Sequence, residues 1–504
     1  MQARGNPALL EREPRFEDIT CSLASVPKLP RAVIRETRDV VRDARDFNDR
    51  VVKPRALELD SRKREEPDYL PWDFVEEANR RGYYSMCIPK LFGGHGINMP
   101  ALAYFLEEIS SGCSAMSNLI GVHYLGIATL CGSFNLRLMN RLMRDVAEGE
   151  RTGKPCLISL AITEPGAGTD VEEMDLISRA KVTCHAKRVA GGYLVNGTKI
   201  FISNGHLSTW HMVIGYSDLD KPEENTVLMA VKTGDKGFSF GRQEHKMGQK
   251  GCPASELIFE DCFVPDENVA IDDEQAKNFK RPIKETNMQL IDYVLSASRA
   301  GVGAFGTGVA RGAYEEALKF ASETEVGGSL LINQEWAQCM LAEMYKNVAL
   351  ARLSYIESNY ANGLHGMFKL LQWKPVFYLQ KYMPQKMVDA VLAPFCDMKI
   401  ATTLFRKFYF DMQKTNESQC TSGWASLSKF AATDAGIKNC QMAVEMMGQS
   451  GLRHDCRAEK HLRDSKLLQI YEGTNQLNRI NLFKNLIGRS VPGAHAFEEG
   501  EGTS

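Results

Sequence analysis

The chain has 504 residues, of which 44% are hydrophobic and 25% are charged, and its formal net charge is -2. This is the composition of an ordinary globular protein, long enough for two to four domains and a large core. The near-neutral charge gives no basis for a nucleic-acid partner. The sequence contains no run of about 18 uncharged apolar residues, so we predict no membrane-spanning helix.

The cysteines and the N-terminus exclude two further classes. The 13 cysteines lie singly, without a Cys-x-x-Cys pair or a Cys/His cluster, so we predict reduced thiols and no metal site. Residues 1–31 are polar, contain several prolines and lack the apolar core of a signal peptide. We therefore expect a loose N-terminal extension and, by default, a cytoplasmic protein.

Helical periodicity is typical of residues 32–154, which we take as an N-terminal helical domain. Ala44, Phe47 and Val51 fall on one face of a helix, with charged side chains elsewhere, and Pro54 interrupts this pattern.

The pattern changes to alternating, strand-like segments over residues 155–270, which predicts a small β-domain. Within it, residues 193–202 read as a strand, an Asn196-Gly197 turn and a second strand.

Residues 271–489 are again helical, with the clearest periodicity at 310–322, 337–359, 427–447 and 476–486, and residues 490–504 form a loose tail. The predicted fold class is therefore α+β and multidomain. An N-terminal all-α domain precedes a middle β-sandwich or barrel, and a C-terminal α-helical bundle follows.

Two motifs carry the candidate chemistry. The first, Tyr471-Glu472-Gly473-Thr474-Asn475-Gln476, places one carboxylate between an aromatic ring and a glycine. In the second, Thr163-Glu164-Pro165-Gly166-Ala167-Gly168-Thr169-Asp170, a proline and two glycines shape a loop whose amides can face a ligand. Together with the helical–β–helical order, these motifs resemble the acyl-CoA dehydrogenase family from about Val41 to Arg489.

The resemblance implies an FAD-dependent enzyme that dehydrogenates an acyl-CoA thioester to a 2-enoyl-CoA. Glu472 would remove the α-proton while a hydride passes from Cβ to flavin N5, and an electron-transfer flavoprotein would take the electrons. A glutamate is a weak base at its ordinary pKa, so this role requires burial to raise that pKa. Three alternatives stay open: a 2-enoyl-CoA reductase, a flavin oxidase or monooxygenase, and a catalytically silent scaffold. Relatives form dimers or tetramers, so a homo-oligomer is expected.

Site residues carry over from the family position by position. The resemblance assigns cofactor contacts to Thr163, Gly168, Thr169, Phe201, Ser203, Thr474 and Gln476. It assigns contacts with the acyl-CoA to Thr169, Arg299, Tyr471 and Gly473. Three of the proposed site residues also have a plainer interpretation. Glu472 could cap a helix, Phe201 could be a core aromatic, and Arg299 could be a surface arginine.

Three features depart from the family or mislead. Residues 301–306 spell Gly-x-Gly-x-x-Gly, but a helical rather than a strand pattern precedes them, so we interpret these glycines as helix–helix packing and not as a dinucleotide site. The arginine that relatives direct to the flavin pyrophosphate of a neighbouring subunit is replaced by Thr324. A glutamine of the same cross-subunit contact is replaced by Glu445.

An inserted segment, about residues 363–423, exceeds what compact relatives carry. Between residues 367 and 410 it holds seven Lys/Arg against two Asp, interleaved with aromatics. An extra helical hairpin with its aromatics packed inward is the favoured interpretation. Docking of a partner protein and contact with a membrane surface remain as alternatives.

Overall fold

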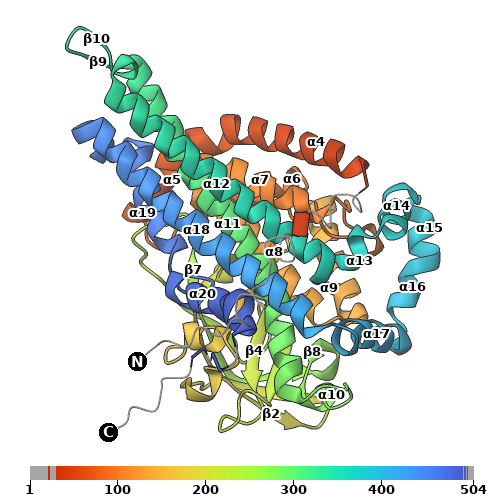
Figure 1. Ribbon diagram of the computed structural model, residues 1–504. Helices are drawn as coiled ribbons and strands as arrows, with labels where there is room; N and C mark the ends of the chain where they lie inside the picture. The colour runs from red at the N-terminus through yellow and green to blue at the C-terminus, as the bar shows by residue number, and fades with distance from the viewer. Residues whose placement is uncertain (1–20, 23–29, 492, 495, 498–504) are drawn as a thin grey trace, which may run out of the picture.

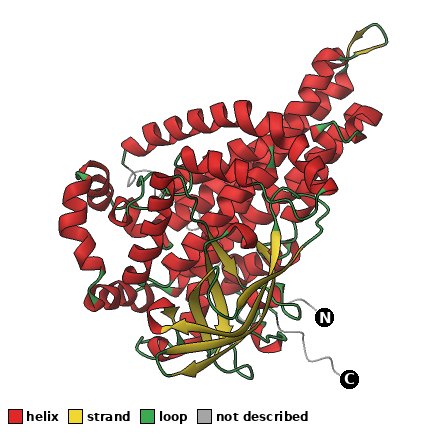
Figure 2. Cartoon of the chain, turned by 180° about the vertical axis from the view of Figure 1, so that it is seen from behind, coloured by secondary structure: helices red, strands yellow, loops and turns green. Residues whose placement is uncertain are grey.

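A computed structural model describes residues 21–22, 30–491, 493–494 and 496–497. The expected loose extension (1–31) and tail (490–504) lie largely outside these ranges. Helices form the larger part of the molecule, and the strands gather at one end of it (Figure 1, Figure 2).

The N-terminal part is helical, as its periodicity predicts. Its helices are α4 (Ala32–Phe47), α5 (Lys53–Glu65), α6 (Trp72–Arg80), α7 (Met99–Gly112), α8 (Ser114–Gly132) and α9 (Leu136–Thr152). Ala44 and Phe47 are fully buried, as expected for the apolar face of α4. Pro54 does not break the chain direction, because a π-helical turn at Asn48–Val52 joins α4 to α5 and the proline lies in the first turn of α5.

The middle part is one mixed sheet. Its strands are β1 (Ile158–Ala161), β2 (His185–Val189), β3 (Gly192–Ser203), β4 (Trp210–Tyr216), β5 (Thr226–Lys232), β6 (Phe238–Gln243), β7 (Ala254–Pro265) and β8 (Val269–Ile271). The order is β6-β7-β3-β2-β4-β5-β8, with β1 parallel to β4. Apolar side chains from β3, β4, β5 and β7 share a single core, so the sheet curls over it.

The predicted turn at Asn196-Gly197 is wrong. Strand β3 runs through these residues, and its pairing with β7 continues on both sides of an irregularity between Val195 and Gly197. Gly197 has φ +142°, and a Cβ there would lie 2.7 Å from Cys184 Cα, so the glycine serves a bulge with a close backbone approach. The hairpin turn instead precedes β3, between Val189 and Gly192.

The C-terminal part is built on three long helices, α11 (Ile283–Glu323), α12 (Glu335–His365) and α18 (Thr415–Met447). Shorter helices α10 (Asp273–Ala276), α19 (Arg457–Leu468) and α20 (Asn475–Leu482) complete it. A hairpin of β9 (Glu325–Val326) and β10 (Ser329–Leu330) projects from the bundle between α11 and α12 (Figure 1).

The Gly-x-Gly-x-x-Gly sequence lies inside α11, as the helical interpretation requires. A Cβ on Gly303 would meet Ser428 Oγ at 2.1 Å, and one on Gly306 would lie 2.7 Å from the carbonyl carbon of Ala432. These glycines therefore let α11 and α18 approach each other closely.

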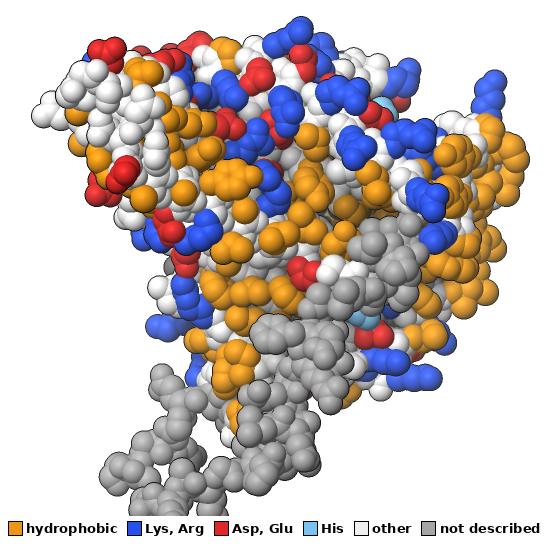
Figure 3. Space-filling view, turned by 45° about the horizontal axis from the view of Figure 1, so that its top comes forward, with side chains coloured by type: hydrophobic (Ala, Val, Ile, Leu, Met, Phe, Trp, Pro, Cys, Tyr) orange, Lys and Arg blue, Asp and Glu red, His pale blue; other side chains and the backbone are white. Residues whose placement is uncertain are grey.

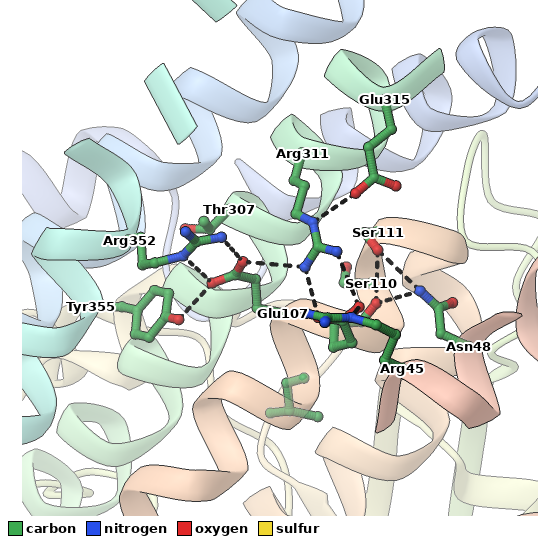
Figure 4. Close-up of polar contacts among 12 residues, drawn as sticks. Arg45, Asn48, Glu107, Ser110, Ser111, Thr307, Arg311, Glu315, Arg352 and Tyr355 are labelled. Carbon is green, nitrogen blue, oxygen red and sulfur yellow. Dashed lines mark hydrogen bonds and ion pairs between the residues drawn. The ribbon is translucent and has the colours of Figure 1, made fainter. Parts of the chain in front are cut away.

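Two consecutive buried glutamates tie four helices together (Figure 4). Glu107 of α7 accepts a hydrogen bond from Arg352 Nε of α12 at 2.9 Å. Its neighbour Glu108 accepts from Arg311 Nη1 of α11 at 2.7 Å and from Arg45 Nε of α4 at 3.2 Å. Because each buried carboxylate is paired with arginine, the network fixes how these helices pack against one another without leaving a lone buried charge.

Helix α8 is long and apolar enough to cross a membrane, yet 78% of its apolar window is buried inside the protein. Its side chains, among them Leu119 and Ile120, belong to the main core. A core helix of a large domain has this character.

The inserted segment forms a row of short helices along one edge of the bundle (Figure 1). They are α13 (Lys369–Gln372), α14 (Lys374–Tyr382), α15 (Gln385–Met387), α16 (Ala393–Cys396) and α17 (Lys399–Arg406), with π-helical turns at Val388–Leu392 and Lys407–Asp411. Phe377, Tyr409 and Phe410 are buried, and Tyr409 stacks on Phe134 with centroids 3.9 Å apart.

The expectation of inward-packed aromatics therefore holds for only part of this segment. It is wrong for four aromatic side chains, between 40% and 66% exposed: Trp373, Tyr378, Tyr382 and Phe395.

A pair of glycine substitutions in α11 tests the close approach. We expect Gly306→Ala to lower the free energy of unfolding by about 1–3 kcal/mol, because its Cβ has no room beside the α18 backbone. Gly301→Ala is the matched control: its Cβ would meet only Leu106 Cδ1, at 3.9 Å, so helix propensity should make it neutral or stabilising. Urea unfolding of both variants measures this, and equal stabilities would contradict the packing interpretation.

Candidate active site

Glu472 lies in the turn between α19 and α20 and is held in an unusual conformation. Its φ is +56° and that of Gly473 is +75°, so two consecutive residues are left-handed. For a non-glycine residue this costs energy and persists only where the surroundings enforce it. Asn478 enforces it from α20, since its Nδ2 donates to the carbonyl oxygens of Glu472, Gly473 and Thr474 at 3.2, 2.9 and 3.0 Å.

Two buried cations hold the same turn from the long helices. Arg299 of α11 donates from Nε to the carbonyl oxygen of Glu472 at 3.2 Å. Lys429 of α18 donates from Nζ to the carbonyl oxygen of Gly473 and to Asn475 Oδ1, both at 2.7 Å. Arg299 is 1% exposed and Lys429 is fully buried. The turn therefore rests on α11 and α18.

The carboxylate of Glu472 has its own partner. Ser298 Oγ donates to Glu472 Oε2 at 2.5 Å. Among the hydrogen bonds of the described residues, none uses the amide N–H of Glu472. Glu472 is a partly buried residue, and it presents its carboxylate and an available backbone donor from the same turn.

A second carboxylate, Glu172, lies beneath the turn. Its Oε2 is 3.6 Å from Arg299 Nη2. A Cβ on Gly473 would lie 3.1 Å from Glu172 Oε2 and 3.2 Å from Arg299 Nη2, so only glycine fits between them. Because Glu172 closely follows Thr169, this contact joins the two sequence motifs in space.

Burial shifts the pKa of three ionisable groups of the site toward the neutral form. Burial raises the pKa of Glu472, although Ser298 and the two cations partly offset this. Burial, and then the charge of Glu472, raise the pKa of Glu172 to about 7. Burial, and then the charge of Arg299, lower the pKa of Lys429 to about 7. Such shifts suit proton transfer at physiological pH.

The loop over residues 163–170 is anchored to the sheet by a buried ion pair. Lys199 Nζ lies 2.8 Å from Glu164 Oε1, and both side chains are fully buried. Glu164 Oε2 also accepts the backbone N–H of Cys184 at 3.0 Å, and the carbonyl oxygen of Thr163 accepts the N–H of Ile200 at 2.9 Å. Thr163 is therefore fixed beside β3, and a Cβ on Gly168 would point into open space.

Phe201 stands out on β3. It has φ +57° and is 54% exposed, within the irregularity that interrupts the pairing with β7 between Lys199 and Ile202. It is not a core aromatic. Ser203 follows two residues later and is partly buried. A raised, exposed ring, a serine on the same strand and the open cradle at Gly168 fit the planar ring of a flavin.

The remaining predicted site residues have mixed positions around the turn. Thr474 Oγ1 accepts the N–H of Leu477 at 3.2 Å and caps α20, so the cap is Thr474 and not Glu472. Gln476 is exposed on α20, and Thr169 is partly buried at the start of a 3-10 turn. Tyr471 Oη accepts a hydrogen bond from Gln249 Nε2 at 3.2 Å. Arg299 is enclosed behind the turn, which favours a role in holding it.

The arginine that relatives direct to a neighbouring subunit is replaced by Thr324, and no other cation of the same loop takes its place. Thr324 ends α11, and the following hairpin turns through Gly327 and Gly328, with φ values of +61° and +83°. Residues 324–330 contain no Lys or Arg, and Glu445 is exposed near the end of α18.

Sequence reasoning missed five residues of the site: Ser298, Glu172, Lys429, Asn478 and Lys199. Ser298 directly precedes Arg299, and Glu172 follows the 163–170 motif by two residues. This closeness in sequence was the signal that could have identified them. Lys429 lies in the middle of a long helix, where nothing local marks it.

The sequence matches three domain descriptions of one family in order. They are "Acyl-CoA dehydrogenase, N-terminal domain" over residues 35–150, the "middle domain" over 159–262, and the "C-terminal domain" over 288–361 and 389–487. Residues 362–388, which include α13 and α14, fall between the two matched parts of the last.

Individual relatives agree with this. A probable acyl-CoA dehydrogenase, FadE25, of Mycobacterium tuberculosis is 26% identical over 90% of this chain and 96% of its own. A cyclohex-1-ene-1-carbonyl-CoA dehydrogenase of Syntrophus aciditrophicus is 28% identical over 87% of this chain and 86% of its own. The solved butyryl-CoA dehydrogenase of Megasphaera elsdenii has the same fold, with a TM-score of 0.67 at 20% identity, over 90% of this chain and 98% of that one. The chain belongs to the acyl-CoA dehydrogenase family, whose members are FAD-dependent flavoprotein oxidoreductases acting on CoA thioesters.

Proposed function

We propose that the protein dehydrogenates an acyl-CoA thioester between Cα and Cβ, with Glu472 as the base that removes the α-proton. The observation that carries this is the carboxylate of Glu472, whose pKa is raised by burial and which Ser298 holds in a strained turn. Strain and a raised pKa at one carboxylate are typical of a catalytic position.

The chain's own groups divide the remaining work. The unused N–H of Glu472 is suited to donate to the thioester oxygen as negative charge develops there. Arg299 and Lys429 act on the opposite side of the turn, where they fix its carbonyl groups. Phe201, Ser203, Thr163 and Gly168 would hold FAD, which when bound supplies the hydride acceptor.

The further assignments of the resemblance are proposals as well. Thr169, Tyr471 and Gly473 would contact the thioester arm, and Thr474 and Gln476 the nucleotide side of FAD. An electron-transfer flavoprotein would receive the electrons. The proposed electron acceptor is tested by comparing turnover with an electron-transfer flavoprotein and turnover with an artificial dye. Turnover with molecular oxygen alone would favour the oxidase alternative.

A cytoplasmic homo-oligomer is also proposed. Helix α12 exposes four large apolar side chains, between 50% and 62% exposed: Trp336, Tyr345, Leu350 and Leu353. A face of this kind suits contact between copies. Analytical ultracentrifugation tests it, and a concentration-independent monomer would contradict it.

Replacement of the base gives the sharpest test. We expect Glu472→Gln to lower kcat by about 10²–10⁴-fold and to abolish exchange of the α-proton with solvent, with flavin content unchanged. The control is Glu285→Gln, an exposed glutamate at the start of α11. Bleaching of the flavin absorbance on anaerobic addition of a panel of acyl-CoA thioesters provides the measurement, and full bleaching by the Glu472→Gln variant would refute the assignment.

The second carboxylate predicts a pH effect. In Glu172→Gln the carboxylate that shares Arg299 with Glu472 is replaced by a neutral amide, so Arg299 faces Glu472 alone and its charge lowers the pKa of Glu472 further. Because the base works as an anion and its activity is lost as pH falls, the acid limb of the kcat/KM profile should move to lower pH by about one unit.

Two companion variants make this result interpretable. Glu172→Asp should keep the parent profile. Asp175→Asn alters a carboxylate of the same loop that is paired with Lys484 at 2.7 Å, and its acid limb should stay in place. Identical acid limbs in the parent and Glu172→Gln would show that the two carboxylates are not coupled.

A further inference from the structure

The outward face of the inserted helices is apolar, where a surface helix is normally polar. We call the helices between Trp373 and Lys407 the strap. Its exposed hydrophobic side chains gather along one edge of the molecule, and Lys and Arg side chains border them (Figure 3). An exposed apolar area of this extent marks an interaction site.

The exposed residues follow helical spacing. Met387, Val391 and Phe395 recur every fourth residue on the solvent side and are 52%, 62% and 41% exposed. On α14 the rings of Tyr378 and Tyr382 stack outside the protein with centroids 6.0 Å apart. The exposure is therefore a continuous stripe along the strap and not a scatter of single residues.

The strap already has a separate inward face. Phe377, Val388, Cys396 and Ala401 are each less than 8% exposed, on the side where the strap contacts α9 and the Lys90–Phe92 turn of the N-terminal part. The outward stripe is thus not required to attach the strap to the rest of the protein. The strap helices therefore have two apolar faces, although one is sufficient to attach them to the protein.

The basic side chains of the strap divide between its inward and outward faces. The basic groups of Lys381 and Arg406 point inward, to Glu36 and to backbone carbonyl oxygens including that of Ser133. Lys386, Lys399 and Lys407 are exposed instead.

The two acidic groups of the strap balance only part of this charge, because just one of them is left without a cation among the residues that the structure describes. Asp389 is paired with Arg144 of α9 at 2.9 Å, and Asp397 Oδ1 lies 3.5 Å from Asn140. The outward charge is therefore positive and carried by lysine.

This chemistry separates a lipid surface from a protein partner. Protein interfaces are enriched in arginine and depleted in lysine, whereas elements that lie on membranes carry lysine or arginine beside tryptophan, phenylalanine and leucine. The strap exposes Trp373, Phe395 and Leu404 beside lysines, and Arg406 is directed inward. We propose that the outer face of the strap docks on an anionic lipid surface, with its apolar stripe in the headgroup region and its lysines on lipid phosphates.

Docking of this kind is peripheral. No element of the strap is long enough to span a bilayer, since its helices have at most nine residues. The proposal is independent of the reaction at Glu472, so either can fail without the other.

Sedimentation of the full-length holoenzyme with vesicles tests the proposal. We expect binding to phosphatidylcholine vesicles containing one third phosphatidylglycerol, little binding to pure phosphatidylcholine, and release at high salt. The double variant Val391→Ser/Phe395→Ser and the double variant Lys386→Gln/Lys399→Gln should each weaken binding about tenfold or more.

Matched controls lie elsewhere on the surface. Leu219→Ser/Phe263→Ser removes exposed apolar groups of the β-domain, and Lys187→Gln/Lys236→Gln removes exposed lysines there. Both should bind vesicles like the parent. All altered residues are exposed, and flavin content with the melting temperature verifies folding.

Several results would overturn the proposal. They are no binding to anionic vesicles, equal binding to both vesicle types, or undiminished binding by the two strap variants. Dissociation of an oligomer by Val391→Ser/Phe395→Ser would show that the stripe joins copies of this chain, and the lipid assignment would fail.

Discussion

The support of one turn by two buried cations is the constraint on which the site depends. Arg299 and Lys429 bind the carbonyl oxygens of Glu472 and Gly473, two consecutive left-handed residues. A turn of this shape would relax if those carbonyls lost their partners, because buried backbone acceptors must be satisfied. The carboxylate of Glu472 is thereby presented in a fixed position.

This support is only as rigid as the packing of the helices that supply it. Arg299 comes from α11 and Lys429 from α18, and the two helices approach closely at Gly303 and Gly306. The glutamate–arginine network of α4, α7, α11 and α12 then fixes the far side of α11 (Figure 4). Glycines that resemble a nucleotide fingerprint thus contribute to the site indirectly, by placing two cations.

The β-domain is joined to the turn by comparable means. The Glu164–Lys199 pair anchors one end of the loop that bears Thr163 and Gly168, and at the other end Glu172 lies against Gly473. The elements proposed to hold FAD and the proposed base are therefore parts of one connected structure. That connection also couples the titration of Glu172 and Glu472, since two carboxylates facing one arginine cannot ionise independently.

The sequence by itself determined the family, the helical–β–helical order and the motifs around Glu472 and Thr163, because these depend on local patterns. It could not identify Lys429 or Glu172 as neighbours of Glu472, since only the packing of α11, α18 and the β-domain loop brings them together. The Asn196-Gly197 signal failed for a related reason, as pairing with β7 overrode a local turn preference. Which aromatics of the strap face solvent was likewise decided by its packing against the N-terminal helical part, because periodicity does not specify which of two apolar faces is covered.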